Sequence, residues 1–140
     1  MTEAKSPNKE RVAIILHSGA YDRVSYALCM ALAALASGME VYMMLTCEGL
    51  KRFSKGHLTE IGDETPLNMH PIVQQGLEIG SIQPLDEQLA DARQLGLKVY
   101  ACPNAMATFK IPKRDLIEVD DVMGLVTFLG LSKGATTWYI

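Results

Sequence analysis

Strand-like apolar runs alternate with helical segments along the chain, which predicts an α/β fold. Residues 11–16 (RVAIIL) form an unbroken β-branched and apolar run, typical of a parallel strand that is buried on both faces. The Ala- and Leu-rich residues 21–37 predict a helix that ends at Gly38, and residues 40–46 predict the next strand. This order is that of a βαβ unit with a right-handed crossover.

The rest of the chain continues the alternation. Up to Phe109 we expect a turn of helix over residues 49–55, helices over residues 70–79 and 84–95, a strand that ends at Cys102, and a helix from there to Phe109. After it we expect a brief strand over residues 116–119, a helix over residues 120–131 and a strand over residues 136–140. Asp120 or Asp121 is the expected N-cap of the helix over residues 120–131. These elements favour one α/β domain with a mainly parallel sheet over residues 11–140, preceded by a flexible polar tail over residues 1–10.

The segment over residues 49–83 is long for a connection in a compact domain, and such segments are usually lids, binding loops or interface arms. It carries more apolar side chains than a mobile loop exposes to water, so we expect a neighbouring subunit of a homo-oligomer to bury them. These side chains are Leu50, Phe53, Leu58, Ile61, Leu67, Met69, Ile72 and Val73.

Charge and cysteine content narrow the function classes. The 140 residues carry a net charge of −3, so we expect neither a nucleic-acid nor a membrane partner. The longest Lys/Arg clusters are the pairs Lys51-Arg52 and Lys113-Arg114, both of which we interpret as solvated surface. The three cysteines form no C-x-x-C pair, which argues against a disulfide framework and a zinc knuckle. The amino-terminal residues lack the apolar core of a signal peptide, and the longest apolar segment is too short to span a bilayer, so we expect a cytoplasmic protein.

Three predicted strands end in residues that can do chemistry. His17 follows the first strand, Cys47 follows the second, and Cys102 lies between a strand and a helix. Ligands of an open parallel sheet bind beyond the carboxyl ends of its strands. We therefore expect these three residues along one edge of the sheet.

Cys102 has the most specific setting of the three. Pro103 follows it, and proline suits the first position of a helix. A thiol placed there meets unpaired backbone N–H groups and the positive end of the helix dipole, a setting that lowers a thiol's pKa and makes it a nucleophile near neutral pH. We therefore take Cys102 as the candidate catalytic residue, with Pro103 and Asn104 as supporting residues. The alternative is a buried, inert thiol.

The other candidates have weaker settings. Cys47 could be a second thiol, although a core residue at a strand end is the favoured interpretation, and Cys29 is expected to pack in the core. His17 could supply a proton or hold an anion beside the thiol, but such a histidine more often binds a loop carbonyl. His57 and His70 lack metal-ligand spacing, and the glycine-rich nucleotide motifs are absent, so we expect no metal and no cofactor.

Four segments carry a family resemblance: the VAIIL strand that leads into an Ala-rich helix, VYMMLTCEGL, VYACPNAM and VMGLVTFL. Together they resemble the DsrE/DsrF-like family, which includes the TusD-type sulfur-relay subunits and a branch called peroxiredoxin-like, over most of residues 11–140. The most specific element is Tyr-Ala-Cys-x-x-x-Met around Cys102, although relatives often have another small residue in place of Pro103. The Thr-x-x-Cys pattern of true peroxiredoxins is absent before Cys102. The resemblance implies a three-layer α/β/α sandwich, an oligomer, and sulfur carried as a persulfide on Cys102.

Three functions remain open, of which the resemblance favours the first. This is a sulfurtransferase-like sulfur carrier, in which Cys102 accepts sulfane sulfur or a thiosulfonate group from a donor protein and passes it to a partner thiol. The second is a redox or stress-sensing thiol protein, in which Cys102 acts alone or forms a disulfide with Cys47, and the disulfide requires Cα atoms no more than about 7 Å apart. The third is a non-enzymatic oligomeric α/β module with an inert Cys102.

Overall fold

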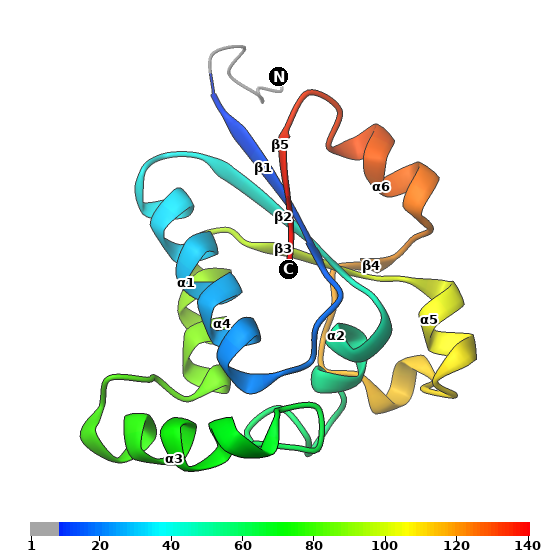
Figure 1. The fold of residues 1–140 in the computed structure, drawn as a ribbon. Helices are drawn as coiled ribbons and strands as arrows, with labels where there is room; N and C mark the ends of the chain where they lie inside the picture. The colour runs from blue at the N-terminus through cyan, green and yellow to red at the C-terminus, as the bar shows by residue number, and fades with distance from the viewer. Residues whose placement is uncertain (1–8) are drawn as a thin grey trace.

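The apolar run over residues 11–16 forms an inner strand of a five-stranded parallel sheet (Figure 1). The computed structural model describes residues 9–140, and its strands lie in the order β4-β3-β2-β1-β5 with every pair parallel. The strands are β1 (Arg11–Leu16), β2 (Glu40–Leu45), β3 (Lys98–Ala101), β4 (Asp121–Val122) and β5 (Thr136–Tyr139). The predicted α/β fold with about five mainly parallel strands is confirmed.

Helices cover both faces of this sheet, which gives the three-layer arrangement (Figure 1). The helices are α1 (Tyr21–Ala36), α2 (Cys47–Arg52), α3 (His70–Ile79), α4 (Leu85–Gln94), α5 (Pro103–Thr108) and α6 (Leu125–Leu131), with short 3-10 turns η1 (Leu67–Met69) and η2 (Lys113–Asp115). The α1 and α4 helices pack together on one face, and α6 covers the other. Both α2 and α5 lie at the carboxyl end of the strands, beside each other.

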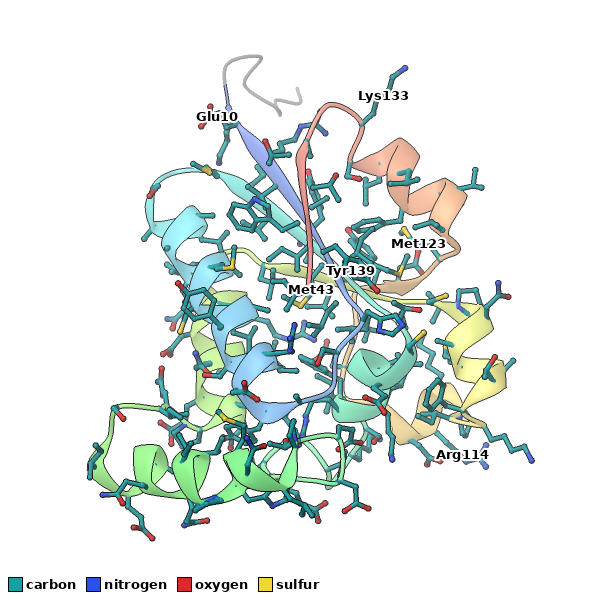
Figure 2. The ribbon with its side chains drawn as sticks, viewed as in Figure 1. Glu10, Met43, Arg114, Met123, Lys133 and Tyr139 are labelled. Atoms are coloured by element: carbon teal, nitrogen blue, oxygen red, sulfur yellow. The ribbon has the colours of Figure 1, made fainter. Side chains whose placement is uncertain are left out.

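The two faces of the sheet bury two apolar clusters of unequal size. Successive residues of β2 point to opposite faces, so Met43 joins the larger cluster with α1 and α4, whereas Tyr42 and Met44 join the smaller one (Figure 2). Phe128 of α6 completes the smaller cluster and meets the ring of Tyr100 edge-on at 6.1 Å. The inner strands β1, β2 and β3 are therefore buried on both faces, as the unbroken apolar runs require.

The region after residue 115 differs from the prediction. The strand expected over residues 116–119 is wrong: Leu116 makes one antiparallel bridge with Ser54, and the sheet strand is β4. The expected helix over residues 120–131 begins only at Leu125, with Gly124 as its N-cap. The physical reason is the Asp120 carboxylate, which accepts the N–H of Val99 at 2.7 Å and so aligns the chain with β3 rather than capping a helix.

The long segment over residues 49–83 is largely packed on its own domain. Its helical turn begins two residues earlier than expected, at Cys47. Four of its eight apolar side chains are buried in the larger cluster, while Leu67 and Ile72 remain exposed. The part of the expected tail over residues 1–8 lies outside the described residues, and the division at residue 10 stays a prediction. No helix among residues 9–140 combines the length and apolar character needed to cross a membrane.

Candidate functional site

The carboxyl ends of three neighbouring strands meet at one edge of the sheet, below and to the right in Figure 1. The N–H of Thr46 donates to the carbonyl of Leu16 at 3.1 Å, and the N–H of Cys102 donates to the carbonyl of Leu45 at 3.1 Å. These bonds continue the parallel ladders one residue past the strands. The expected grouping of these three strand ends along one edge is therefore observed.

Cys102 lies at the junction that the sequence predicts, between β3 and α5. It is the N-cap of α5, its backbone is extended (φ −81°, ψ 119°), and Pro103 occupies the first helical position. The carbonyl of Cys102 accepts the N–H of Met106 at 3.0 Å, the first bond of the helix. The thiol itself makes no capping hydrogen bond. Cys102 is half-buried and packs against both apolar clusters, whereas Pro103 and Asn104 are exposed.

Cys47 occupies the equivalent junction of the neighbouring strand, between β2 and α2. Its backbone has φ +50°, a left-handed conformation that is uncommon for residues other than glycine. The hydroxyl of Thr46 donates to the Cys47 sulfur at 3.7 Å, and the side chain is half-buried. The favoured interpretation of Cys47 as a core residue at a strand end is wrong. Cys47 is half-buried and is the first residue of α2, because the chain turns tightly after β2.

Two glycines allow α2 to lie close to the end of β1. A Cβ atom on Gly49 would come within 2.3 Å of the carbonyl oxygen of Leu16, and one on Gly19 within 2.5 Å of that of Glu48. The N–H of Gly49 donates to the carbonyl of His17 at 3.0 Å. The turn that presents Cys47 is therefore held against the β1 end by backbone contact, which only residues without a side chain permit.

His17 lies at the same edge but belongs with β5. Its N–H donates to the carbonyl of Ile140 at 2.7 Å, and its exposed ring lies 5.8 Å from that of Tyr139, which is also exposed. His17 follows β1, whereas Cys102 follows β3. Because β2 lies between these two strands, their backbones are about 10 Å apart. Cys47 and Cys102, by contrast, follow adjacent strands.

A buried arginine ties the irregular segment to this edge. Arg52 is fully buried, and its guanidinium lies 5.5 Å from the centre of the Tyr21 ring. Its nitrogens donate to the carbonyls of Gly19, His57, Glu60 and Ile61 and to the Glu64 carboxylate. Burial lowers the pKa of Arg52, which the Glu64 charge opposes. The segment after α2 is thus fixed to the loop between β1 and α1.

Glu64 is the charge partner of this arginine and is 1% exposed. It also accepts from Lys51 at 3.2 Å and from His57 Nε2 at 2.9 Å, while His57 Nδ1 lies 2.8 Å from Glu60. Burial acts to raise the pKa of Glu64, but its own backbone N–H, His57 and Lys51 hold it below the usual value. His57 therefore has a structural role, as does His70, whose Nε2 bonds to the carbonyl of Thr65.

Several features of the edge and its surroundings have no clear signal in the sequence. Cys29 was expected in the core but is exposed on α1, where its sulfur accepts a hydrogen bond from Gln88 at 3.2 Å. Its Ala and Leu neighbours suggested burial, yet only one side of α1 faces the sheet. The predicted solvated position of Arg52 is wrong: the side chain is buried, because tertiary folding brings together the carbonyls that bind it. No cluster that could hold a metal ion occurs in the described part of the chain.

Comparison with known proteins identifies the family to which this fold is similar. A model of the DsrE/DsrF-like family matches residues 10–136. No curated protein matches the chain. The sequence resemblance to this family is therefore confirmed over nearly the whole chain, including both cysteine-bearing strand ends.

Solved structures show the same fold at low sequence identity. The protein of unknown function MTH1491 from Methanobacterium thermoautotrophicum is 12% identical, with a TM-score of 0.66 over 94% of this chain and 100% of that one. The ychN protein from E. coli is 13% identical, with a TM-score of 0.64 over 94% and 99%. The conserved protein BT1422 from Bacteroides thetaiotaomicron is 16% identical, with a TM-score of 0.62 over 99% and 100%.

Proposed function

Because the chain belongs to the DsrE/DsrF-like family, in which sulfur relay is the general activity, we propose that it carries sulfane sulfur on Cys102. The observation that carries the proposal is the placement of Cys102 at the N-cap of α5, half-buried at the carboxyl edge of the sheet. A half-buried thiol can be reached by a partner and still shield a bound sulfur atom from bulk solvent.

The transfer is an exchange between sulfur atoms. The Cys102 thiolate attacks the terminal sulfur of a donor persulfide, R–S–SH. The S–S bond of the donor breaks, and R–S⁻ leaves with the bonding electron pair. Cys102 then holds the terminal sulfur as Cys–S–SH, still bearing its proton, and an acceptor thiolate removes it by the same step. No net oxidation occurs, so the relay needs no redox cofactor.

Mass spectrometry after incubation with glutathione persulfide tests this proposal. We expect the peptide that contains Cys102 to gain the mass of one sulfur atom, and Cys102→Ser to abolish the gain. Serine is a preferred N-cap residue, so this variant keeps the start of α5 and its failure would not reflect unfolding. Cys29→Ser, on the exposed side of α1, is the matched control. Equal loading of Cys102→Ser and the wild type would refute the role of Cys102.

A redox thiol protein is the second candidate, and the left-handed backbone of Cys47 favours it. Both cysteines follow adjacent strands and both are free. In this case hydrogen peroxide at low concentration oxidises the two thiols to a Cys47–Cys102 disulfide. The peroxide takes up the two electrons and two protons that the thiols release and becomes water. Peptide mapping without reductant detects that disulfide. A persulfide on Cys102 that forms equally well in Cys47→Ser favours the carrier function.

The chain is also proposed to work as a homo-oligomer and with separate sulfur-donor and sulfur-acceptor proteins in the cytoplasm. Exposed apolar side chains support self-association. Leu125, Val126 and Leu129 of α6 are 51%, 88% and 46% exposed, and Leu67 is 84% exposed. Apolar groups gathered on a helix in this way are typical of contact surfaces.

A further inference from the structure

We propose that a group of four cations beside α5 is the docking surface for an acidic segment of the protein that exchanges sulfur with Cys102. The basic patch, as we call it, consists of Lys55, Lys110, Lys113 and Arg114. The inference rests on the proposed relay function and adds the charge of its partner. Lys113 and Arg114 are solvated, as the sequence predicts, and the proposal adds a partner for their charge.

The four residues lie together although they come from two parts of the chain. Lys110 follows the end of α5, and Lys113 and Arg114 lie in η2. The N–H of Lys55 donates to the carbonyl of Asp115 at 2.7 Å, which places the loop after α2 along η2. All four side chains are exposed. The two chain segments that carry these cations therefore meet at η2.

The patch keeps a net positive charge. The ion pairs found among residues 9–140 use Lys51, Arg52, His57 and Arg93, and none involves a patch cation. Asp115 is the single carboxylate within the η2 turn. The whole chain has a net charge of −3, so this concentration of cations opposes the overall balance. A local field of that kind attracts an oppositely charged partner.

The backbone conformation of Lys110 is a second observation that supports a function for the patch. It has φ +55° at the end of α5, where the N–H of Ile111 closes the helix by donating to the carbonyl of Met106 at 2.9 Å. Glycine is the favoured residue at such a position. The chain instead places an exposed cation there, at a cost of about 1 kcal/mol.

The patch lies within reach of a partner seated on Cys102. Lys110 follows Cys102 by eight residues, which at the helical rise of 1.5 Å per residue is about 12 Å along α5. A standard interface covers about 800 Å² on each partner, equivalent to a disc of about 16 Å radius. An interface of that size centred on Cys102 extends to the turn at Lys110, where the basic patch begins. An acidic protein fits better than a nucleic acid, because four cations interrupted by Asp115 form no continuous track for a phosphate backbone.

Titration of ¹⁵N-labelled protein with a hexaglutamate peptide tests docking independently of sulfur chemistry. We expect amide shifts confined to residues 54–56 and 108–116 at low ionic strength, fading as salt shortens the Debye length from about 30 Å to about 8 Å. Lys113→Glu/Arg114→Glu should abolish them, and the milder Lys113→Gln/Arg114→Gln should weaken them. Lys133→Glu is the matched control, because Lys133 lies at the opposite end of the molecule from Arg114 (Figure 2). Unlocalised shifts, or shifts that survive charge reversal, would overturn the proposal.

Sulfur transfer to cysteine peptides then separates the docking claim from the relay claim. A persulfide-loaded wild-type protein should pass sulfur about tenfold faster to a glutamate-flanked cysteine peptide than to a serine-flanked one, and charge reversal should remove this preference. If neither peptide receives sulfur although the hexaglutamate shifts persist, the relay fails and the docking surface stands. If a uridine oligonucleotide produces stronger, patch-centred shifts than hexaglutamate, the partner is a nucleic acid and the proposal is wrong.

Discussion

Arg52 and Glu64 are charged side chains that fold an irregular segment instead of facing solvent. Arg52 binds four backbone carbonyls, and Glu64 binds the side chains of Lys51, Arg52 and His57. Burying such groups is costly, so they stabilise the fold only because nearly every polar atom finds a partner. The result is an ordered link between the loop after α2 and the loop that follows β1.

The depressed pKa of Glu64 predicts an acid-sensitive part of the stability. Its folded pKa lies below the unfolded value of about 4.3, so its contribution is fully present above that pH and is lost as pH falls through the folded pKa. We expect the free energy of unfolding to decrease as the solution is acidified below about pH 5. Glu64→Gln should be less stable at neutral pH, because Arg52 loses its charge partner, and should show a flatter acid slope.

Urea unfolding at a series of pH values measures this effect. Glu78→Gln is a suitable control, because Glu78 is exposed on α3, where its carboxylate accepts a hydrogen bond from the side chain of Gln74. If Glu64→Gln and the wild type lose stability in parallel between neutral and acidic pH, the Glu64 contribution is absent.

At the level of elements, the short helices α2 and α5 matter most because each begins at a cysteine junction. Both have only six residues, too few to be stable alone, so tertiary contacts hold them in place. For α2 the decisive contact is the approach of Gly49 to the end of β1. The position of Cys47 depends on that approach.

Two glycine substitutions should therefore have opposite effects. Gly49→Ala places a Cβ atom 2.3 Å from the Leu16 carbonyl oxygen and should cost about 1–3 kcal/mol or more, because the backbone must shift. Gly130→Ala, within α6 and with open space around its Cβ, should gain about 0.5–1 kcal/mol through lower unfolded-state entropy. Thermal unfolding of both variants checks the pair, and an unchanged Gly49→Ala would contradict the tight junction.

At the scale of the whole molecule, the two faces of the sheet are covered unequally. The α1 and α4 helices bury a large cluster, whereas the smaller cluster depends on Phe128 of a single short helix whose outer side is apolar. A second subunit over α6 would bury that outer side and thicken the cover of this face. The apolar residues of the long segment, from which the sequence predicts an oligomer, contribute less because half of them are internal.

We accordingly expect the protein to exceed its chain mass of 15.3 kDa in light scattering. Val126→Glu/Leu129→Glu should shift it toward the monomer, because a charge in a desolvated contact is unfavourable. Ile79→Glu, at an exposed apolar position on α3, is the control that should leave the mass unchanged. A monomeric wild type would rule out self-association.

Elements whose signals are local can be predicted from the order of the amino acids alone. The unbroken apolar run of β1, the helix over residues 21–37 and the Cys102–Pro103 junction are visible because periodicity, glycine ends and proline starts act within a few residues. The remaining features depend on contacts between distant parts of the chain. Asp120 caps no helix because a neighbouring strand offers the Val99 N–H, Arg52 is buried because distant carbonyls converge on it, and Cys29 is exposed because one side of α1 faces water. Each outcome depends on which partner the fold brings close, and no local pattern encodes that choice.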